Sequence, residues 1–420
     1  MSNIKNFIST KNFGTFEELK EFFVRNDIDV KEDGNEYMLC FKDTSDLNEK
    51  WVRECNGTIF EKNTNKLLHY FFEKTYDGLS GIPGNERLLK EENINNDLFP
   101  VAFLGENIRI SIYLEGSLIK VYPVVADEGD HSQVVADEGD HSQVVADEGG
   151  HPQVVADEGR ISWKVATSRA INAATNFWNS DKSFKEMFAE GVSNTFELEL
   201  SDYLSKLDPN YCYSFLLQHP DNNKILPVTE PVVHFINKVH LETLEETTLD
   251  LEYFSVVGKG GEPVTCIKDL ERSKISDNYL IYVLDTEGKI KSRIKYLNDK
   301  FTSKRELYGN YPNLGLRYLE MYNNDGDFRN NLINNFPEQE ELLDEIDRKF
   351  LQTSNEIFAL YRRIYMQKNK IQIIKKYKRP IYVLHGIYLE TKKNITLQDV
   401  LNYMYNLDPW VLANLIEFNW

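Results

Sequence analysis

The chain has 420 residues, a formal net charge of -19 and an isoelectric point near 5.0. That length suffices for one large core or two medium ones, and the charge excludes polyanion binding except through a local basic patch. No apolar run approaches the roughly 18 residues of a membrane span, and the N-terminus lacks the apolar stretch of a secretory signal. The four cysteines are too widely spaced for a zinc or redox pair, so we expect no membrane partner, no metal site and an intracellular, cytoplasmic location.

The N-terminal region predicts a helix followed by strands. Residues 15–18 form a capping box that opens an amphipathic helix reaching about Asn26. Alternation of apolar and polar residues predicts a strand over residues 36–41. Residues 51–60 and 66–78 then read as two consecutive strands.

Residues 107–122 predict two short strands around a turn at Glu115, Gly116 and Ser117. Isoleucines alternate with polar residues before the turn, and apolar residues dominate after it. A carboxylate followed by glycine and a hydroxyl, set between strands, suits a ligand that the backbone approaches closely.

Residues 124–159 form a low-complexity insert in which VVADEGDHSQ occurs twice and is followed by VVADEGGHPQ and VVADEG. His131, His141 and His151 recur beside acidic residues, but we favour a solvated loop over a cation site because the composition is polar and low in complexity. The insert separates two predicted strands, so we expect it to lengthen a hairpin tip without disturbing the core.

After Lys300 the pattern becomes helical, with segments over 314–322 and 338–366 and a last segment after Thr396. One stretch of this region, residues 362–379, is strongly basic and contains no acidic residue. Tyr361, Tyr365 and Tyr377 are interleaved with its cations, an arrangement that can stack single-stranded nucleic acid. The competing interpretation is a solvated helix face. The predicted RNA-binding residues are Arg362, Arg363, Lys375, Lys376, Lys378 and Arg379, and Lys368 and Lys370 complete the run.

The turn Tyr113-Leu114-Glu115-Gly116-Ser117 resembles the Lys-x-Asp/Glu-Gly-Ser/Thr motif of phage-type ATP-dependent RNA ligases and related nucleotidyltransferases, including ligase-like proteins of large DNA viruses. In that family the lysine takes AMP from ATP, whereas Tyr113 stands at its position here. The resemblance covers about residues 40–310, with the elements in the family's order. It implies an α+β, ATP-grasp-like nucleotidyltransferase domain with antiparallel sheets over 1–310, a helical domain over 311–420 that recognises RNA, and ATP and Mg²⁺ as cofactors.

Other family elements are present with substitutions. The Glu-Cys-Arg-Gly-x-x-Phe element is matched at 54–60, but Asn56 replaces the nucleotide-contacting arginine, and an amide lacks the charge with which a guanidinium binds phosphate. Lys74 and Lys164 match lysines of two further elements. Leu216 falls at a catalytic-site glutamate, although Glu197 and Glu199, on what reads as an alternating strand, remain alternatives. Asn223 falls at an arginine, Asp277 at a glutamate, and His219 is expected to be a structural hydrogen-bonding turn residue.

Residues 277–297 predict a hairpin that carries paired cations. Lys289 with Lys291 and Arg293 with Lys295 both have the i, i+2 spacing that places two positive groups on one face of a strand. We favour Arg293 and Lys295, because an aromatic residue follows them as it often does in the family. With Asn56, Lys74, Glu115, Gly116 and Lys164, they make up the predicted nucleotide-binding set.

The missing lysine decides the predicted chemistry. Adenylyl transfer needs a nitrogen nucleophile, and a tyrosyl phosphodiester would be far more inert. Lys120 lies five residues beyond Glu115, and on an extended chain it would face the other side. Loss of a covalent nucleophile typically lowers the rate by about 10⁴-fold or more. We therefore expect a ligase-like protein that binds nucleotide or RNA without lysine-dependent adenylyl transfer.

Two alternatives remain. The chain could be an active ATP-dependent RNA ligase or nucleotidyltransferase whose motifs align differently from the alignment above. It could also be a protein-interaction scaffold that uses the acidic repeats, in which case deleting residues 124–159 should abolish partner capture and leave the fold intact.

Overall fold

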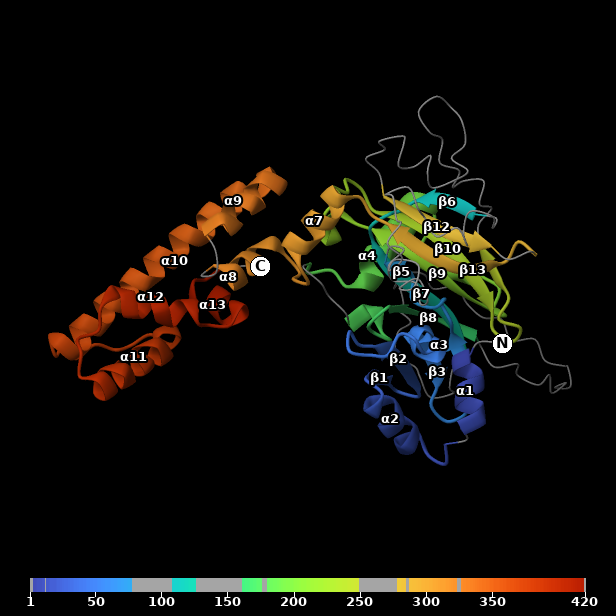
Figure 1. Ribbon diagram of the computed structural model, residues 1–420, viewed down its shortest axis with the longest axis horizontal. Helices are drawn as coiled ribbons and strands as arrows, with labels where there is room; N and C mark the ends of the chain where they lie inside the picture. Colours follow the sequence, from blue (N-terminus) through green and yellow to red (C-terminus); the bar gives the residue numbers. More distant parts are fainter. Residues whose placement is uncertain are drawn as a thin grey trace, which may run out of the picture. The chain divides into compact units, whose positions relative to one another are not determined.

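The structure, a computed structural model, describes residues 3–11, 13–77, 108–125, 161–175, 180–248, 278–284, 287–322 and 326–418. The chain divides into two compact units, the first made of Met1–Asn222 with Val228–Tyr296 and the second of Asn223–Pro227 with Leu297–Trp420. The first unit combines helices with sheets that are antiparallel apart from one short pair, and the second is helical (Figure 1). The expectation of an α+β chain with antiparallel sheets and a helical C-terminal region is therefore confirmed.

The N-terminal sheet packs against the first two helices. Its strands are antiparallel and follow the order β1-β2-β3-β4. The hydroxyl of Thr15 accepts a hydrogen bond from the backbone N of Glu18, as the capping pattern predicts, and the helix buries Leu19 and Phe23. The elements are α1 (Asn3–Lys11), α2 (Phe16–Arg25), β1 (Ile28–Asp33), β2 (Glu36–Phe41), β3 (Asn56–Glu61) and β4 (Leu67–His69).

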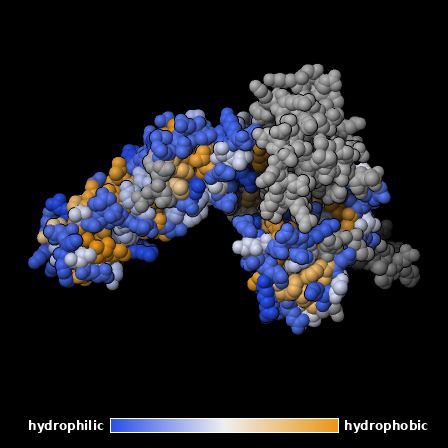
Figure 2. All heavy atoms as spheres, in the orientation of Figure 1, coloured by the Kyte–Doolittle hydropathy of each residue, from blue (hydrophilic) through white to orange (hydrophobic). Residues whose placement is uncertain are grey.

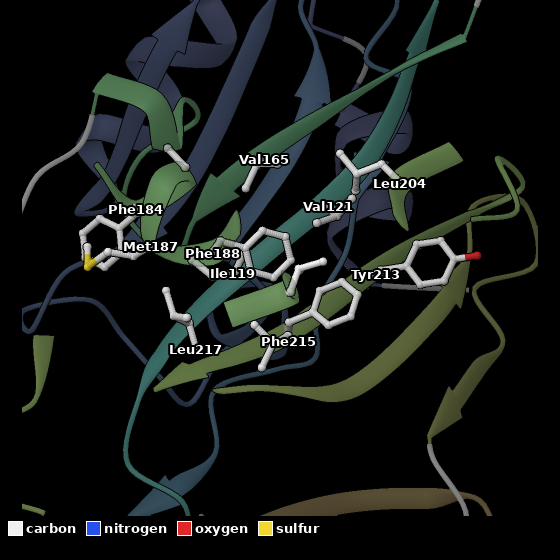
Figure 3. Packing of buried hydrophobic residues seen from close by; sticks show 13 residues of the cluster. Ile119, Val121, Val165, Phe184, Met187, Phe188, Leu204, Tyr213, Phe215 and Leu217 are labelled. Carbon is white, nitrogen blue, oxygen red and sulfur yellow. The ribbon is translucent and has the colours of Figure 1, made fainter. Parts of the chain in front are cut away.

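The central sheet carries an apolar core of the first unit. Its strand order is β11-β10-β9-β7-β8, and helix α4 packs on one face of it against alternate residues such as Ile119, Val121 and Phe215 (Figure 3). Strands β7 and β8 pair up to Val125 and Ile161, so the insert joins two neighbouring antiparallel strands, although residues 126–160 lie outside the described part of the chain. The elements are β7 (Ser117–Val125), β8 (Ile161–Thr167), α4 (Phe184–Phe196), α5 (Leu200–Ser205), β9 (Tyr211–Gln218), β10 (Val232–His240) and β11 (Glu246–Thr248).

A third sheet receives the strand that precedes the Glu-Gly-Ser turn. Its order is β5-β13-β12-β6, where β12 and β13 form the hairpin predicted over 277–297. Strand β6 pairs with β12, whereas β7 belongs to the central sheet, so residues 113–116 carry the chain from one sheet to the other. The elements are β5 (Tyr76–Asp77), β6 (Ile108–Ile112), β12 (Tyr279–Leu284) and β13 (Ile290–Tyr296).

Three strand predictions differ from the structure. Residues 66–78 form two short strands rather than one, β4 and β5, which belong to different sheets. Within residues 51–60, the first part belongs to helix α3 (Lys50–Glu54), whose Val52 is buried and whose Trp51 stacks on Phe7 at 4.5 Å between ring centres. Periodicity cannot distinguish a helix from a strand over so short an apolar run, and packing against α1 decides it. The predicted strand through Glu197 and Glu199 is also absent, because α4 extends to Phe196 and Glu197 takes a left-handed conformation before α5.

The second unit is built around the long helix α10. Leu343, Ile346, Phe350 and Ile357 recur on one face of it at helical spacing and are fully buried. In the part of the chain that the structure describes, each helix is too short or too polar to cross a membrane. The helices are α7 (Asp299–Tyr308), α8 (Leu314–Met321), α9 (Gly326–Asn335), α10 (Glu340–Tyr361), α11 (Lys378–Thr391), α12 (Leu397–Tyr405) and α13 (Pro409–Leu415).

Candidate functional site

The turn after β6 brings Tyr113 next to a cation of the predicted hairpin. The backbone N of Tyr113 donates to the carbonyl of Asn278 at 2.7 Å. The amine of Lys295, on β13, lies 5.9 Å from the centre of the Tyr113 ring. Both side chains are half-buried, so this pair is partly open to solvent.

The rest of the turn lies against the end of β9. The carbonyl of Glu115 accepts a hydrogen bond from the amide of Gln218 at 2.8 Å. A Cβ at Gly116 would lie 2.6 Å from the carbonyl O of Leu217 and 2.9 Å from Cγ of Leu216, so only glycine fits here. Gly116 therefore serves close packing on β9, and Leu216 forms part of that contact.

A lysine that sequence reasoning set aside lies on β7, the strand that follows this turn. The side chain of Lys120 is fully buried, and its amine donates to the carbonyl oxygens of Asn56 at 2.8 Å and Gly57 at 2.6 Å. Burial lowers the pKa of this amine to about 8. Lys120 thus ties β7 of the central sheet to β3 of the N-terminal sheet at Asn56 and Gly57.

The strand ladder fixes the face on which Lys120 lies, whereas its expected facing relative to Glu115 stays a prediction. That expectation assumed an extended chain from Glu115 onward, whereas residues 113–116 are not strand and β7 begins at Ser117. In the ladder between β7 and β9, Lys120 lies opposite Ser214 and Leu118 opposite Leu216. Alternate strand residues share a face, so Lys120 lies on the face of Leu216 and Gln218, away from α4.

Buried polar groups continue across this face of the central sheet. The Nε2 atom of His69 lies 3.4 Å from the hydroxyl of Ser214 and 3.1 Å from the carbonyl of Tyr213. Burial holds the pKa of His69 well below its ordinary value, so its ring is neutral. Asn237, opposite Ser214 on β10, donates to Glu246 at 2.7 Å. His69 Nδ1 and Asn237 Oδ1 have no hydrogen-bond partner among the described residues, so this face has capacity for further polar contacts.

The other predicted nucleotide-binding residues are spread more widely. Arg293 is buried, forms an ion pair with Glu246, and places its guanidinium carbon 3.5 Å from the centre of the Phe72 ring. The Lys74 amine lies 5.4 Å from the centre of the Phe41 ring, on the N-terminal sheet. Asp277 and the side chain of Lys291 lie outside the described residues.

Lys164 and the alternative cation Lys289 have partners of their own. Lys164 pairs with Glu36 at 2.8 Å and lies opposite Tyr122 in the β7–β8 ladder. Lys289 is exposed and pairs with Glu287 at 3.2 Å. The structure therefore brings together Tyr113, Glu115, Gly116 and Lys295, and separately places Asn56 against Lys120.

His219 has the hydrogen bonds expected of a structural turn residue. Its Nδ1 accepts from the backbone N of Asp221 at 3.1 Å, and its Nε2 lies 3.0 Å from a carboxylate oxygen of Glu190. Because Nδ1 accepts, the neutral ring carries its proton on Nε2 and donates to that carboxylate. Both nitrogens are thus used in holding the turn.

In the second unit, the basic stretch is exposed for the most part. Lys376 is the exception among the predicted residues, since it pairs with Glu417 at 2.8 Å. Tyr361 and Tyr377 are 2% and 4% exposed and cannot serve as stacking platforms, whereas Tyr365 is 37% exposed. Sequence reasoning missed Tyr382, which is 79% exposed.

Comparison with known proteins finds one viral relative and no family assignment. No protein-family model matches the chain. The "Immediate-early protein ICP-46 homolog" of Invertebrate iridescent virus 3 is 24% identical over 166 residues, which are 38% of this chain and 35% of that protein. The match thus spans about a third of that relative, whose name states no biochemical activity.

Proposed function

We propose that the first unit is an RNA ligase-like, ATP-grasp-like nucleotidyltransferase domain that binds a nucleotide without lysine-dependent adenylyl transfer, in a protein whose second ligand is RNA. The observation that carries the proposal is the pair formed by Tyr113 and Lys295. Tyr113 stands at the nucleophile position of the ligase-like turn, with the amine of Lys295 5.9 Å from its ring centre. This arrangement supports binding of a phosphate, while the amine that would attack ATP is absent from residue 113.

ATP with Mg²⁺ is the nucleotide we propose. Among the described residues, no group of three or more histidine, cysteine, aspartate or glutamate side chains could hold a metal ion. Mg²⁺ is commonly held through substrate phosphates and water rather than by an all-protein cage, so it would enter with the triphosphate. Lys295 would contact the phosphates, because its amine lies beside Tyr113 at the turn, whereas Arg293 is buried in an ion pair with Glu246. The viral relative is compatible with a location in the host cytoplasm, which we include in the proposal.

Calorimetry with Mg-ATP tests this proposal. We expect binding by the full chain, weakened about tenfold or more by Lys295→Ala, because that variant has no amine to donate a charge-assisted hydrogen bond to phosphate. Lys289→Ala is the matched control on the same hairpin, since Lys289 is exposed and paired with Glu287. Equal binding by the wild-type protein and both variants, or no binding at all, would refute the assignment of the site.

A second candidate function, active adenylyl transfer, is favoured by Lys120. Its amine has a pKa lowered to about 8 by burial and lies beside Asn56. In such a reaction the neutral amine attacks the α-phosphorus of ATP and a nitrogen–phosphorus bond forms. Pyrophosphate leaves with the electrons of the broken bond, and the nitrogen releases one proton to water. Incubation with ATP labelled at the α-phosphate separates the candidates. A protein–AMP adduct that Lys120→Met abolishes and Tyr113→Phe retains would replace the first proposal with the second.

A further inference from the structure

The second unit contains a wide helical turn at the start of its basic stretch. Helix α10 passes at Tyr361 into a π-helical turn over Arg362–Met366. The backbone N of Gln367 donates to the carbonyl of Arg362 at 2.9 Å, and Lys368 takes a left-handed conformation with φ 57°. π turns are rare and occur frequently at functional sites, so this turn marks the segment as a candidate for binding.

Helix α11 presents an exposed aromatic ring between cations. Tyr382 is 79% exposed, while Ile381 and Leu384 on the opposite side of the helix are buried. Lys378 and Arg379 precede Tyr382 by four and three residues, so they lie beside it on the same helix face, and both are exposed. A largely exposed tyrosine ring flanked by two positive charges suits a planar ring attached to a phosphate.

Stacked rings join the π turn to α11. The rings of Tyr365 and His385 are nearly parallel, at 9°, with centres 3.7 Å apart. Tyr388 continues the stack, with its ring centre 5.7 Å from that of His385. Tyr365 is 37% exposed at one end of the stack, so a further flat ring can add to it.

The local charge is opposite to that of the chain as a whole. The protein carries a net charge of -19, yet residues 362–389 contain no acidic residue. Figure 2 shows hydrophobic residues among hydrophilic ones over the part of the helical unit where Figure 1 labels α11. We call the exposed set formed by Arg362, Arg363, Tyr365, Lys368, Lys370, Lys375, Lys378, Arg379 and Tyr382 the basic–aromatic surface.

We propose that the basic–aromatic surface binds single-stranded RNA, with bases stacked on Tyr382 and Tyr365 and phosphates held by the neighbouring cations. This inference rests on the RNA part of the proposed function and names the surface and the form of RNA. A protruding ring can stack only on an unpaired base, which favours single strands over duplex RNA. A membrane-binding helix would present a broad face of large apolar residues, whereas α11 exposes only Tyr382 and Leu389 of that kind.

The test measures the anisotropy of a fluorescent oligouridine of about 12 nucleotides, a typical site length, titrated with the full chain. We expect Tyr382→Ala to weaken binding by about 5- to 150-fold, because one base has no stacking partner in that variant, and Tyr382→Phe to retain it. The paired change of Lys378→Gln and Arg379→Gln should reduce the dependence of log affinity on log salt by about 0.7 for each phosphate that these cations no longer neutralise. Leu389→Ala, which removes another exposed apolar side chain of α11, is the control and should bind as wild type.

Three results would overturn the inference. One is binding of duplex RNA as tight as that of the single strand. Another is binding to vesicles containing phosphatidylserine that depends on Tyr382, with no binding of RNA. The third is RNA affinity unchanged in Tyr382→Ala while the circular dichroism spectrum stays that of wild type. ATP binding by the wild-type protein and Lys295→Ala reports on the first unit, so failure of this inference and failure of the nucleotide proposal can be told apart.

Discussion

The buried amine of Lys120 makes the stability of the first unit depend on pH in a specific direction. The ordinary pKa of a lysine is 10.5, and burial lowers it to about 8 here. Between these two values the unfolded chain keeps a proton that the folded chain has released, so stability rises with pH through that window. Below pH 8 both states are protonated, and the folded state carries the full burial penalty, about 3 kcal/mol for such a difference.

Replacement of Lys120 by methionine should remove this dependence while filling a similar volume. From pH 7 to pH 9 the wild-type protein should gain about 1.3 kcal/mol of unfolding free energy relative to Lys120→Met. The difference in unfolding free energy between the two proteins at a single pH is less informative than its change from pH 7 to pH 9. The two carbonyls that lose their donor destabilise the variant by about 1–3 kcal/mol each, and relief of the buried charge offsets part of that.

Urea unfolding at pH 7 and pH 9, followed by the fluorescence of tryptophans that include Trp51 and Trp163 of the first unit, measures the difference. Lys66→Met removes an exposed lysine of the same unit and should show the wild-type pH dependence. Parallel pH profiles for the wild-type protein and Lys120→Met would refute the reasoning, because the amine would then titrate alike in both states.

Substitutions at Gly57 and Glu36, with Gly34 as a reference position, test other buried contacts of the first unit. Gly57→Ala should destabilise the protein by about 3 kcal/mol in urea unfolding, since φ is +72° and the new Cβ would lie 2.7 Å from the carbonyl of Ser168. Gly34→Ala is the reference, with φ +54° and nothing within 4 Å of the new Cβ, and it should lower the unfolding free energy by only about 1 kcal/mol. Equal losses would show that backbone strain alone matters. Glu36→Leu should cost about 2 kcal/mol by the same assay, because the buried hydroxyl of Tyr122 loses an acceptor at 2.7 Å. A loss below about 0.5 kcal/mol, the size expected of a surface pair, would contradict this.

Local signals in the sequence were sufficient to predict secondary structure where a short segment determines its own conformation. The cap at Thr15 and the β12–β13 hairpin follow from neighbouring residues, and both are present. Helix α3 could not be predicted in this way, because its five residues are helical through packing of Trp51 on Phe7. The same limit applies to the turn at 113–116, whose flanking strands look like one unit in sequence but join different sheets.

The candidate site shows a second limit of prediction from sequence, because its geometry depends on segments that are far apart in the chain. Lys120 is buried because Gly57 leaves room for its amine, and no local pattern connects the two residues. Tyr382 is different, because the apolar spacing of Tyr377, Ile381 and Leu384 already places it on the opposite, outer side of the helix. Counting apolar spacing through the basic stretch would have identified the exposed ring from sequence.

Under the proposed function, the turn at residues 113–116 recognises a nucleotide without transferring its adenylyl group. Gly116 is required by packing on β9, since a Cβ there would lie 2.6 Å from a backbone carbonyl, so this glycine alone does not indicate a nucleotide. The same turn holds Tyr113 beside Lys295, whose amine lies 5.9 Å from the ring centre. A phenol there can hydrogen-bond a phosphate and stack on a base, but it forms only an inert ester with AMP. The proposal therefore predicts recognition of the nucleotide without its transfer.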